Sequence, residues 1–203
     1  MPIEIEKKFR LTQKQRETIL SRLAEIGATL IATEFEENTI YGSDQIDLKS
    51  SIIRLRRVGN KAILTYKQRL QSTSTIKHQQ EDETQVSDAD TMDAILQALG
   101  LIPILVYEKR RIKWKLGQAE VVVDDLPFGL FMEIEASEAD IMGIERQLAI
   151  KGLKVETATY PRLTRKHGRK EGPLIEARFE KKETRNRSTK LPEAARSGRN
   201  KKV

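Results

Sequence analysis

The chain has 203 residues, a net charge of +7 and no cysteine, so disulfides, thiolate metal sites and a cysteine nucleophile are excluded. This length predicts one domain, with room for an appendage. The charge is unevenly distributed: residues 165–203 carry 14 Lys and Arg against 5 Asp and Glu, whereas the preceding 164 residues carry 23 against 25. We therefore expect a near-neutral folded part and a basic, disordered tail over residues 171–203, where apolar residues are too few to form a core.

No targeting signal is visible at the start of the sequence. The first residues, MPIEIEKKFR, lack the basic-then-apolar layout of a signal peptide. The longest apolar run, residues 99–107, is too short to span a bilayer. We expect a cytoplasmic monomer or homodimer without a membrane partner.

The predicted elements begin with a strand at the N-terminus, and three amphipathic helices follow along the chain. The segment Thr12–Gly27 starts with a residue that can cap a helix, ends at a glycine and carries apolar residues at helical spacing. The same spacing predicts helices from about Asp88 to Leu99 and from about Asp140 to Gly152.

Most of the remaining chain alternates between apolar and polar residues, as strands do. The predicted strands are Ile3–Leu11, Thr33–Tyr41, Ser51–Arg57, Lys61–Lys67, Lys77–Val86, Val106–Lys115, Glu120–Asp124 and Phe131–Ala136. Short links, such as those at Gly59 and Gly117, join neighbouring strands. The pattern indicates an α+β fold with an antiparallel sheet, closed or strongly curved, and helices outside it.

Charge is concentrated on one face of these strands, because residues two apart point the same way. The acidic set on this face is Glu4, Glu6, Glu81, Glu83, Asp124, Glu133 and Glu135. The basic set is Lys8, Arg54, Arg56, Lys67, Lys109 and Arg111. If the face points outward, it contributes only solubility. If it points inward, the sheet encloses opposed charges, whose burial costs several kcal/mol per ion unless each one is paired.

Such an enclosed array suits the binding of a polyphosphate together with a divalent metal. Carboxylate oxygens are the ligands that Mg²⁺ and Mn²⁺ prefer, and Arg and Lys bind phosphate oxygens. Phosphoryl transfer depends mainly on positioning and charge stabilisation, so it needs few other groups. No glycine-rich phosphate loop, Ser-His-Asp set or zinc spacing offers a competing site.

The motifs in their chain order resemble the CYTH family, also called triphosphate tunnel metalloenzymes. The N-terminal EIEKK matches the ExExK signature of that family, and IRLRR, LTYK, an ExE segment, KRR and VVVDDLPFGLFMEIE follow in the family's order, over roughly residues 3 to 163. The resemblance implies a domain over residues 1–170, built as an eight-stranded antiparallel β-barrel, or tunnel, with helices packed outside.

The resemblance also implies roles for individual residues, with Mg²⁺ or Mn²⁺ as the cofactor. The implied metal ligands are Glu4, Glu6, Asp124, Glu133 and Glu135. The implied phosphate-binding residues are Lys8, Arg54, Arg56, Lys67, Lys109 and Arg111. Catalysis would depend on Glu4, Glu6 and Lys67, and Glu81 and Glu83 are additional candidates. Two positions depart from the family pattern: Gln79 stands where a basic residue is expected, and Thr159 replaces the serine of a Ser-Tyr pair ahead of Tyr160.

Three activities are compatible with this sequence. The first is a metal-dependent triphosphatase acting on inorganic triphosphate, ATP or thiamine triphosphate, and we favour it because hydrolysis requires no nucleoside recognition. The second is an adenylyl cyclase of class IV type, which makes cyclic AMP and pyrophosphate from ATP. The third is a protein that binds polyphosphate, nucleotide or nucleic acid without turnover, with nucleic acid contacted only through the basic tail.

Overall fold

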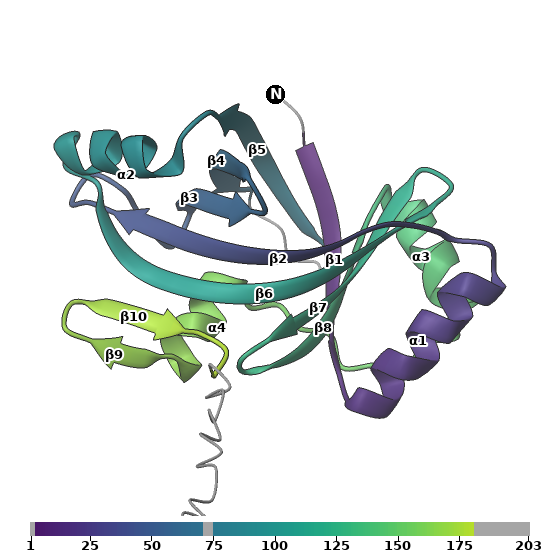
Figure 1. The fold of residues 1–203 in the computed structure, drawn as a ribbon. Coiled ribbons are helices and arrows are strands. Elements are labelled where there is room, and N and C mark those ends of the chain that lie inside the picture. The colour runs from purple at the N-terminus through teal and green to yellow at the C-terminus, as the bar shows by residue number, and fades with distance from the viewer. Residues whose placement is uncertain (1–2, 71–74, 181–203) are drawn as a thin grey trace, which may run out of the picture.

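The computed structural model describes residues 3–70 and 75–180, and its centre is a closed antiparallel barrel (Figure 1). The barrel strands are β1 (Ile3–Leu11), β2 (Thr29–Gly42), β3 (Ser51–Val58), β4 (Lys61–Arg69), β5 (Lys77–Val86), β6 (Ile102–Leu116), β7 (Ala119–Leu126) and β8 (Gly129–Glu135). They follow the order β2-β3-β4-β5-β1-β8-β7-β6, and pairing between β6 and β2 closes the barrel. The predicted fold class and the eight-stranded antiparallel tunnel are confirmed.

The long pair β2–β6 determines where the remaining elements can attach. Its register runs from Thr29 opposite Lys115 to Gly42 opposite Ile102, so nearly all of β6 is paired with β2 along one edge. On the other edge only Arg110–Leu116 pairs with β7. The first half of that edge is therefore available to a further strand.

Four helices pack against the barrel: α1 (Gln13–Glu25), α2 (Ala89–Ala98), α3 (Glu138–Gln147) and α4 (Tyr160–His167). The first three are the predicted helices. Their N-cap side chains, Thr12, Asp88 and Ser137, accept hydrogen bonds from backbone amides of the first turn. α3 ends before the predicted Gly152, since Ala149 adopts a φ of 54° that no α-helix accommodates. No helix in the described part of the chain is long and apolar enough to cross a membrane.

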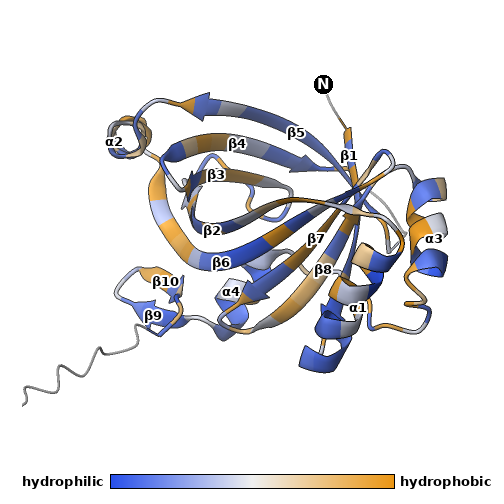
Figure 2. Ribbon diagram, turned by 45° about the vertical axis from the view of Figure 1, so that its right-hand side comes forward, coloured by the Kyte–Doolittle hydropathy of each residue, from blue (hydrophilic) through white to orange (hydrophobic). Residues whose placement is uncertain are grey.

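The apolar faces of the strands point outward and are covered by helices. Phe9, Val121 and Met132 pack with Leu23 of α1 and Ile141 of α3, and a separate cluster joins α2 to β3 and β4. Figure 2 shows the alternation of apolar and polar residues along the strands. Because successive side chains point to opposite faces, the charged residues of the same strands point into the barrel. The fold therefore adopts the inward arrangement of the charged face.

The last part of the described chain forms elements that were not predicted. Two short strands, β9 (Arg169–Glu171) and β10 (Leu174–Ala177), follow α4, and β10 pairs in parallel with Leu105–Tyr107 on the edge of β6 that β7 leaves available. The predicted disorder from residue 171 onward is thus wrong for residues 171–177. Composition could not reveal the order, because pairing with β6 and packing on α4 supply the partners of this weakly apolar segment. Residues 181–203 of the predicted tail lie outside the described residues.

α4 and β10 lie beside the part of β6 that β7 leaves unpaired (Figure 1). Tyr160 and Leu163 of α4 and Ala177 of β10 pack with Ile40 and Phe131 of the barrel. Tyr160 thereby reaches the interior from outside the eight strands. The C-terminal elements consequently contribute to the wall of the lumen as well as to the fold.

Replacing Gly168 by Ala should destabilise the fold by about 1–3 kcal/mol, as overpacking commonly does. A Cβ at Gly168 would lie 2.7 Å from the carbonyl oxygens of Glu176 and Thr164, which are backbone atoms that cannot turn aside. Thermal unfolding measures the loss. Gly143→Ala in α3 is the matched control: the nearest atom lies at 3.9 Å, and alanine favours the helix, so stability should stay equal or rise. Equal stability of the two variants would contradict the close approach of α4 and β10.

Candidate functional site

The barrel encloses a cavity of about 480 Å³, which is within the size range of small-molecule sites. Every site residue predicted from the sequence lines this cavity except Asp124. Strands β1 and β2 stand opposite each other in the strand order, and the residues on the two sides differ in charge. The fold thus gathers side chains that are far apart in the sequence into one cavity.

One side of the cavity, here called the acidic wall, is formed by β1, β5, β7 and β8. Its members are Glu4, Glu6, Glu81, Glu120, Glu133 and Glu135. Lysines hold several of these carboxylates: Lys67 Nζ lies 2.5 Å from Glu4 Oε2 and 2.7 Å from Glu81 Oε2. Lys77 Nζ lies 2.7 Å from Glu6 Oε1.

The acidic wall carries more negative charge than its lysines neutralise. Burial raises the pKa of Glu4 to about 7, and a hydrogen bond with Glu81 adds to the rise despite the opposing charge of Lys67. Burial is also the main cause that raises the pKa of Glu135 to about 7, and the negative charges of Glu4 and Glu120 add to this rise. These carboxyl groups repel one another, so the wall favours a bound proton or a bound cation.

The opposite side, here called the cationic wall, is formed by Arg54 and Arg56 of β3 and Lys109 and Arg111 of β6. Arg54 Nη2 donates to Thr65 Oγ1 at 3.2 Å and lies 3.6 Å from Glu81 Oε1. The Nε atoms of Arg54 and Arg56 are buried, and neither has a hydrogen-bond partner among the described residues. Both arginines line the cavity, and each guanidinium carries five N–H donors, so these groups can bind an anion there.

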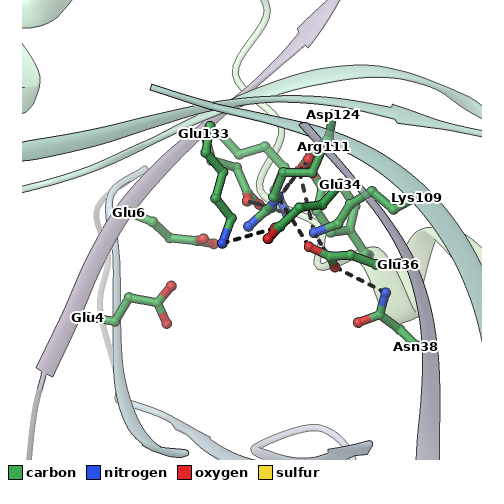
Figure 3. A network of polar contacts seen from close by, with 12 residues as sticks. Glu4, Glu6, Glu34, Glu36, Asn38, Lys109, Arg111, Asp124 and Glu133 are labelled. Carbon is green, nitrogen blue, oxygen red and sulfur yellow. Dashed lines mark hydrogen bonds and ion pairs between the residues drawn. The ribbon is translucent and has the colours of Figure 1, made fainter. Parts of the chain in front are cut away.

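Behind the cationic wall lies Glu36, a fully buried carboxylate on β2 that the sequence reading missed (Figure 3). Lys109 Nζ lies 3.1 Å from Glu36 Oε2, Arg56 Nε 3.6 Å from the same oxygen, and Arg111 Nε 3.9 Å from Oε1. Burial alone would raise the pKa of Glu36, but Lys109, Arg111 and Arg56 together hold it far below its usual value. In the segment TEFEENTI, Glu36 precedes Asn38 by two residues and Ile40 by four, so all three share one face of the strand. This spacing could have identified Glu36 as a residue of the inner face.

Asp124 also lies behind the wall, not at the cavity surface. It is fully buried, and Arg111 donates to Oδ1 at 2.7 Å through Nε and to Oδ2 at 2.6 Å through Nη2. The Tyr160 hydroxyl donates to Oδ2 at 2.7 Å. Arg111 reaches Glu133 Oε2 at 2.7 Å as well, so the guanidinium is held from two sides. Asp124 therefore orients Arg111.

Lys8 lies between the acidic wall and Tyr160 of α4. Its Nζ lies 2.9 Å from Glu133 Oε1 and 3.8 Å from the centre of the Tyr160 ring. Burial opposes the charge of Lys8, but Glu133 and Glu6 prevail and raise its pKa above the ordinary value. In contrast, burial and the neighbouring Arg111 lower the pKa of Lys109 to about 8.

The structure gives physical meaning to both departures from the family pattern. Gln79 lines the cavity, and the buried Lys77 two residues earlier supplies a cation on the same face of β5. Lys77 was not among the predicted site residues. Thr159 caps α4 by accepting a hydrogen bond from the Arg162 amide, a role that serine can also fill. The cap fixes the start of the helix that presents Tyr160.

Within the described part of the chain, no group of three or more His, Cys, Asp or Glu side chains is arranged as a metal site. The donor chemistry nevertheless fits a hard cation, because the acidic wall offers only carboxylate oxygens. Burial is the main cause of the raised pKa values of Glu4 and Glu135, and neighbouring carboxylates add to the rise; a divalent cation would oppose both effects.

Replacing Glu36 by Gln should destabilise the fold by about 3–5 kcal/mol, the usual cost of removing one member of a buried ion pair. Urea unfolding measures the loss. The contribution of Glu36 is fully present above about pH 4.3, the pKa of an unfolded glutamate, and is lost as the pH falls toward the lower folded value, so the difference from wild type should shrink in acid.

Glu34→Gln on the same strand is the matched control for this substitution. Glu34 pairs with Lys113 at 3.3 Å, and both side chains are partly exposed. We expect a loss of less than about 1 kcal/mol. Similar losses in the two variants would show that Glu36 does not hold the cationic wall.

The fold and site can be compared with known proteins. The PH1012 protein from Pyrococcus horikoshii OT3 is 26% identical, with a TM-score of 0.68 over 77% of this chain and 96% of that one. HpAC1 from Hippeastrum, an adenylyl cyclase candidate with a dominant triphosphatase activity, is 19% identical, with a TM-score of 0.60 over 80% and 95%. An adenylate cyclase candidate from Vibrio parahaemolyticus is also 19% identical, with a TM-score of 0.61 over 78% and 95%.

No curated protein matches the sequence. A scan against protein families matches the CYTH domain over residues 2–162. This match spans most of the chain, and the barrel contains the motifs on which the resemblance was based. The chain belongs to the CYTH domain family.

Proposed function

We propose that this protein is a metal-dependent triphosphatase, which hydrolyses an inorganic or organic triphosphate with Mg²⁺ or Mn²⁺ in the barrel cavity. The observation that carries the proposal is the pair of opposed walls. Carboxylates with a raised pKa, Glu4 and Glu135, face arginine and lysine side chains across one cavity. A triphosphate with its metal complements both walls, because its oxygens match the cations and its metal matches the carboxylates.

The chain's cations would hold the phosphate groups. Arg54, Arg56 and Arg111 present planar guanidinium groups to the cavity, and these bind phosphate oxygens in bidentate fashion. Lys8 and Lys109 add positive charge beside Tyr160 of α4. Asp124 and Glu36 fix the orientation of Arg111 and Lys109 beforehand, so little ordering is required when the substrate binds.

The acidic wall would hold the metal through Glu4, Glu6, Glu133 and Glu135. We do not assign Asp124 to this set, because it is fully buried and does not line the cavity, whereas the four glutamates do. When bound, a divalent cation supplies charge neutralisation and makes water more acidic. Glu4 and Glu6 would contribute to catalysis as ligands of this metal, because both carboxylates line the cavity.

Lys67 is placed to act on the leaving group. Its Nζ contacts Glu4 and Glu81 and lines the cavity, so it can turn from these carboxylates to a phosphate oxygen. When water attacks the terminal phosphorus, the bond to the bridging oxygen breaks and negative charge develops on the departing diphosphate. Lys67 and Arg54 would neutralise that charge.

Adenylyl cyclase activity is the second candidate, and one feature of the cavity favours it. Ile40, Ile52, Tyr107 and Pro161 line the cavity beside the charged residues and could contact a base or a sugar. The fold shared with HpAC1 and the Vibrio protein is compatible with either activity. Hydrolysis remains the primary proposal because the cavity lining is mostly charged.

A product assay with Mg²⁺ or Mn²⁺ on inorganic triphosphate, ATP and thiamine triphosphate tests the proposal. We expect orthophosphate release, reduced about 100-fold or more in Glu4→Gln or Glu6→Gln variants that remain folded. Glu17→Gln, on the exposed side of α1, is the control and should keep full activity. Cyclic AMP with pyrophosphate would identify a cyclase, and binding without turnover would identify a non-catalytic protein.

The substitution Arg54→Ala should weaken the binding of triphosphate much more than that of monophosphate, because only the longer anion reaches several cations at once. Calorimetric titration with both anions measures the ratio. Arg57→Ala removes an arginine from the outer face of the same strand, where it pairs with Asp90 at 2.7 Å, and should change neither affinity. Equal losses for the two anions in Arg54→Ala would argue against a triphosphate site.

A further inference from the structure

A second charged site lies outside the cavity, on α4 and β9. Five exposed cations occur within nine residues there: Arg162, Arg165, Lys166, Arg169 and Lys170. We call this set the α4–β9 basic surface. In the described part of the chain, none of the five side chains makes an ion pair. Residues 162–170 contain these five cations and no acidic residue, so the surface has a local excess of free positive charge.

The helix separates this surface from the cavity. Arg162, Arg165 and Lys166 follow the i, i+3, i+4 spacing of one helical face, whereas Tyr160 and Leu163 are buried against the barrel. Cations in the last turn of a helix also stabilise its dipole, which accounts for Arg165 and Lys166. That effect does not account for Arg162 in the first turn or for the two cations of β9.

The surface belongs to the same C-terminal part of the chain as the basic tail. α4, β9 and β10 lie side by side (Figures 1 and 2), and the described chain ends three residues after β10. Beyond Glu180, the sequence adds 9 Lys and Arg against 2 Asp and Glu. The positive charge of the whole protein is therefore concentrated in this region.

We propose that the α4–β9 basic surface binds a nucleic acid through its phosphate backbone. Closely spaced arginines and lysines on one exposed face neutralise successive phosphates and release their counterions. An anionic membrane is a poorer match, because an interfacial helix must insert an apolar face. The apolar residues of α4 are buried, and the large exposed apolar residues of the described chain lie on other elements. This inference does not depend on the reaction in the cavity.

Fluorescence anisotropy of the full chain with a short labelled DNA duplex and a short labelled RNA, over a series of KCl concentrations, tests the proposal. Changing all five cations to Gln should weaken binding and make the slope of log affinity against log salt less negative by about 3–5 for the duplex. Arg162→Lys, Arg165→Lys and Arg169→Lys combined keep the charge and should keep the slope. Circular dichroism and thermal unfolding establish that each variant is folded.

The matched control neutralises five exposed lysines elsewhere on the barrel, Lys14, Lys49, Lys61, Lys151 and Lys154. It has the same net charge as the first variant, and its salt slope should equal that of wild type. If the first variant does not fold, Arg169→Gln with Lys170→Gln is compared with Lys151→Gln and Lys154→Gln. Absence of nucleic-acid binding by wild type, or equal losses in surface and control variants, would overturn the proposal. So would surface-dependent binding to phosphatidylserine vesicles alone.

Discussion

Burial of opposite charges inside the barrel is the constraint on which the rest of the structure depends. The helices take up the apolar faces of the strands, so the charged faces must point inward. Each buried ion costs several kcal/mol unless it is paired, and the strands meet this requirement by placing acids and bases across from one another. Lys67 between Glu4 and Glu81 is the clearest example. Arg54 and Arg56 line the cavity, so their guanidinium groups are where an anion can bind.

The charged residues form two layers with different physical roles. Residues at the cavity surface, such as Glu4 and Lys67, pair with each other and can exchange this contact for one with a bound ligand. Behind them, Glu36 and Asp124 are fully buried and hold the cationic wall in place. Such a fixed second layer means that the cations are oriented before a ligand arrives, which lowers the cost of binding and strengthens electrostatic stabilisation of a reacting phosphate.

The elements after the barrel extend the CYTH domain in both structure and charge. The family match ends at residue 162, whereas α4 continues to His167 and β9 and β10 follow it. On the buried side of this region, the first turn of α4, which lies within the family match, presents Tyr160 to Asp124, and Leu163 and Ala177 pack against the barrel. On its exposed side it carries unpaired cations. One short helix thus separates an enclosed anion site from an open basic surface, and the two can act independently.

Much of the fold could be predicted because its signals are local. β1 and β5 have the predicted bounds, α1 begins directly after the predicted cap Thr12, and α2 begins close to the predicted start at Asp88, since periodicity and capping depend only on neighbouring residues. From the residues alone, the charged face could point either inward or outward. It points inward because the helices cover the apolar face on the outside of the barrel. Glu36 became a counter-ion only when β2 closed against β6. The order of residues 171–177 likewise arose from an unpaired edge of β6. The sequence determined which residues share a face, and tertiary contacts decided what each face meets, because pairing partners and burial come from distant parts of the chain.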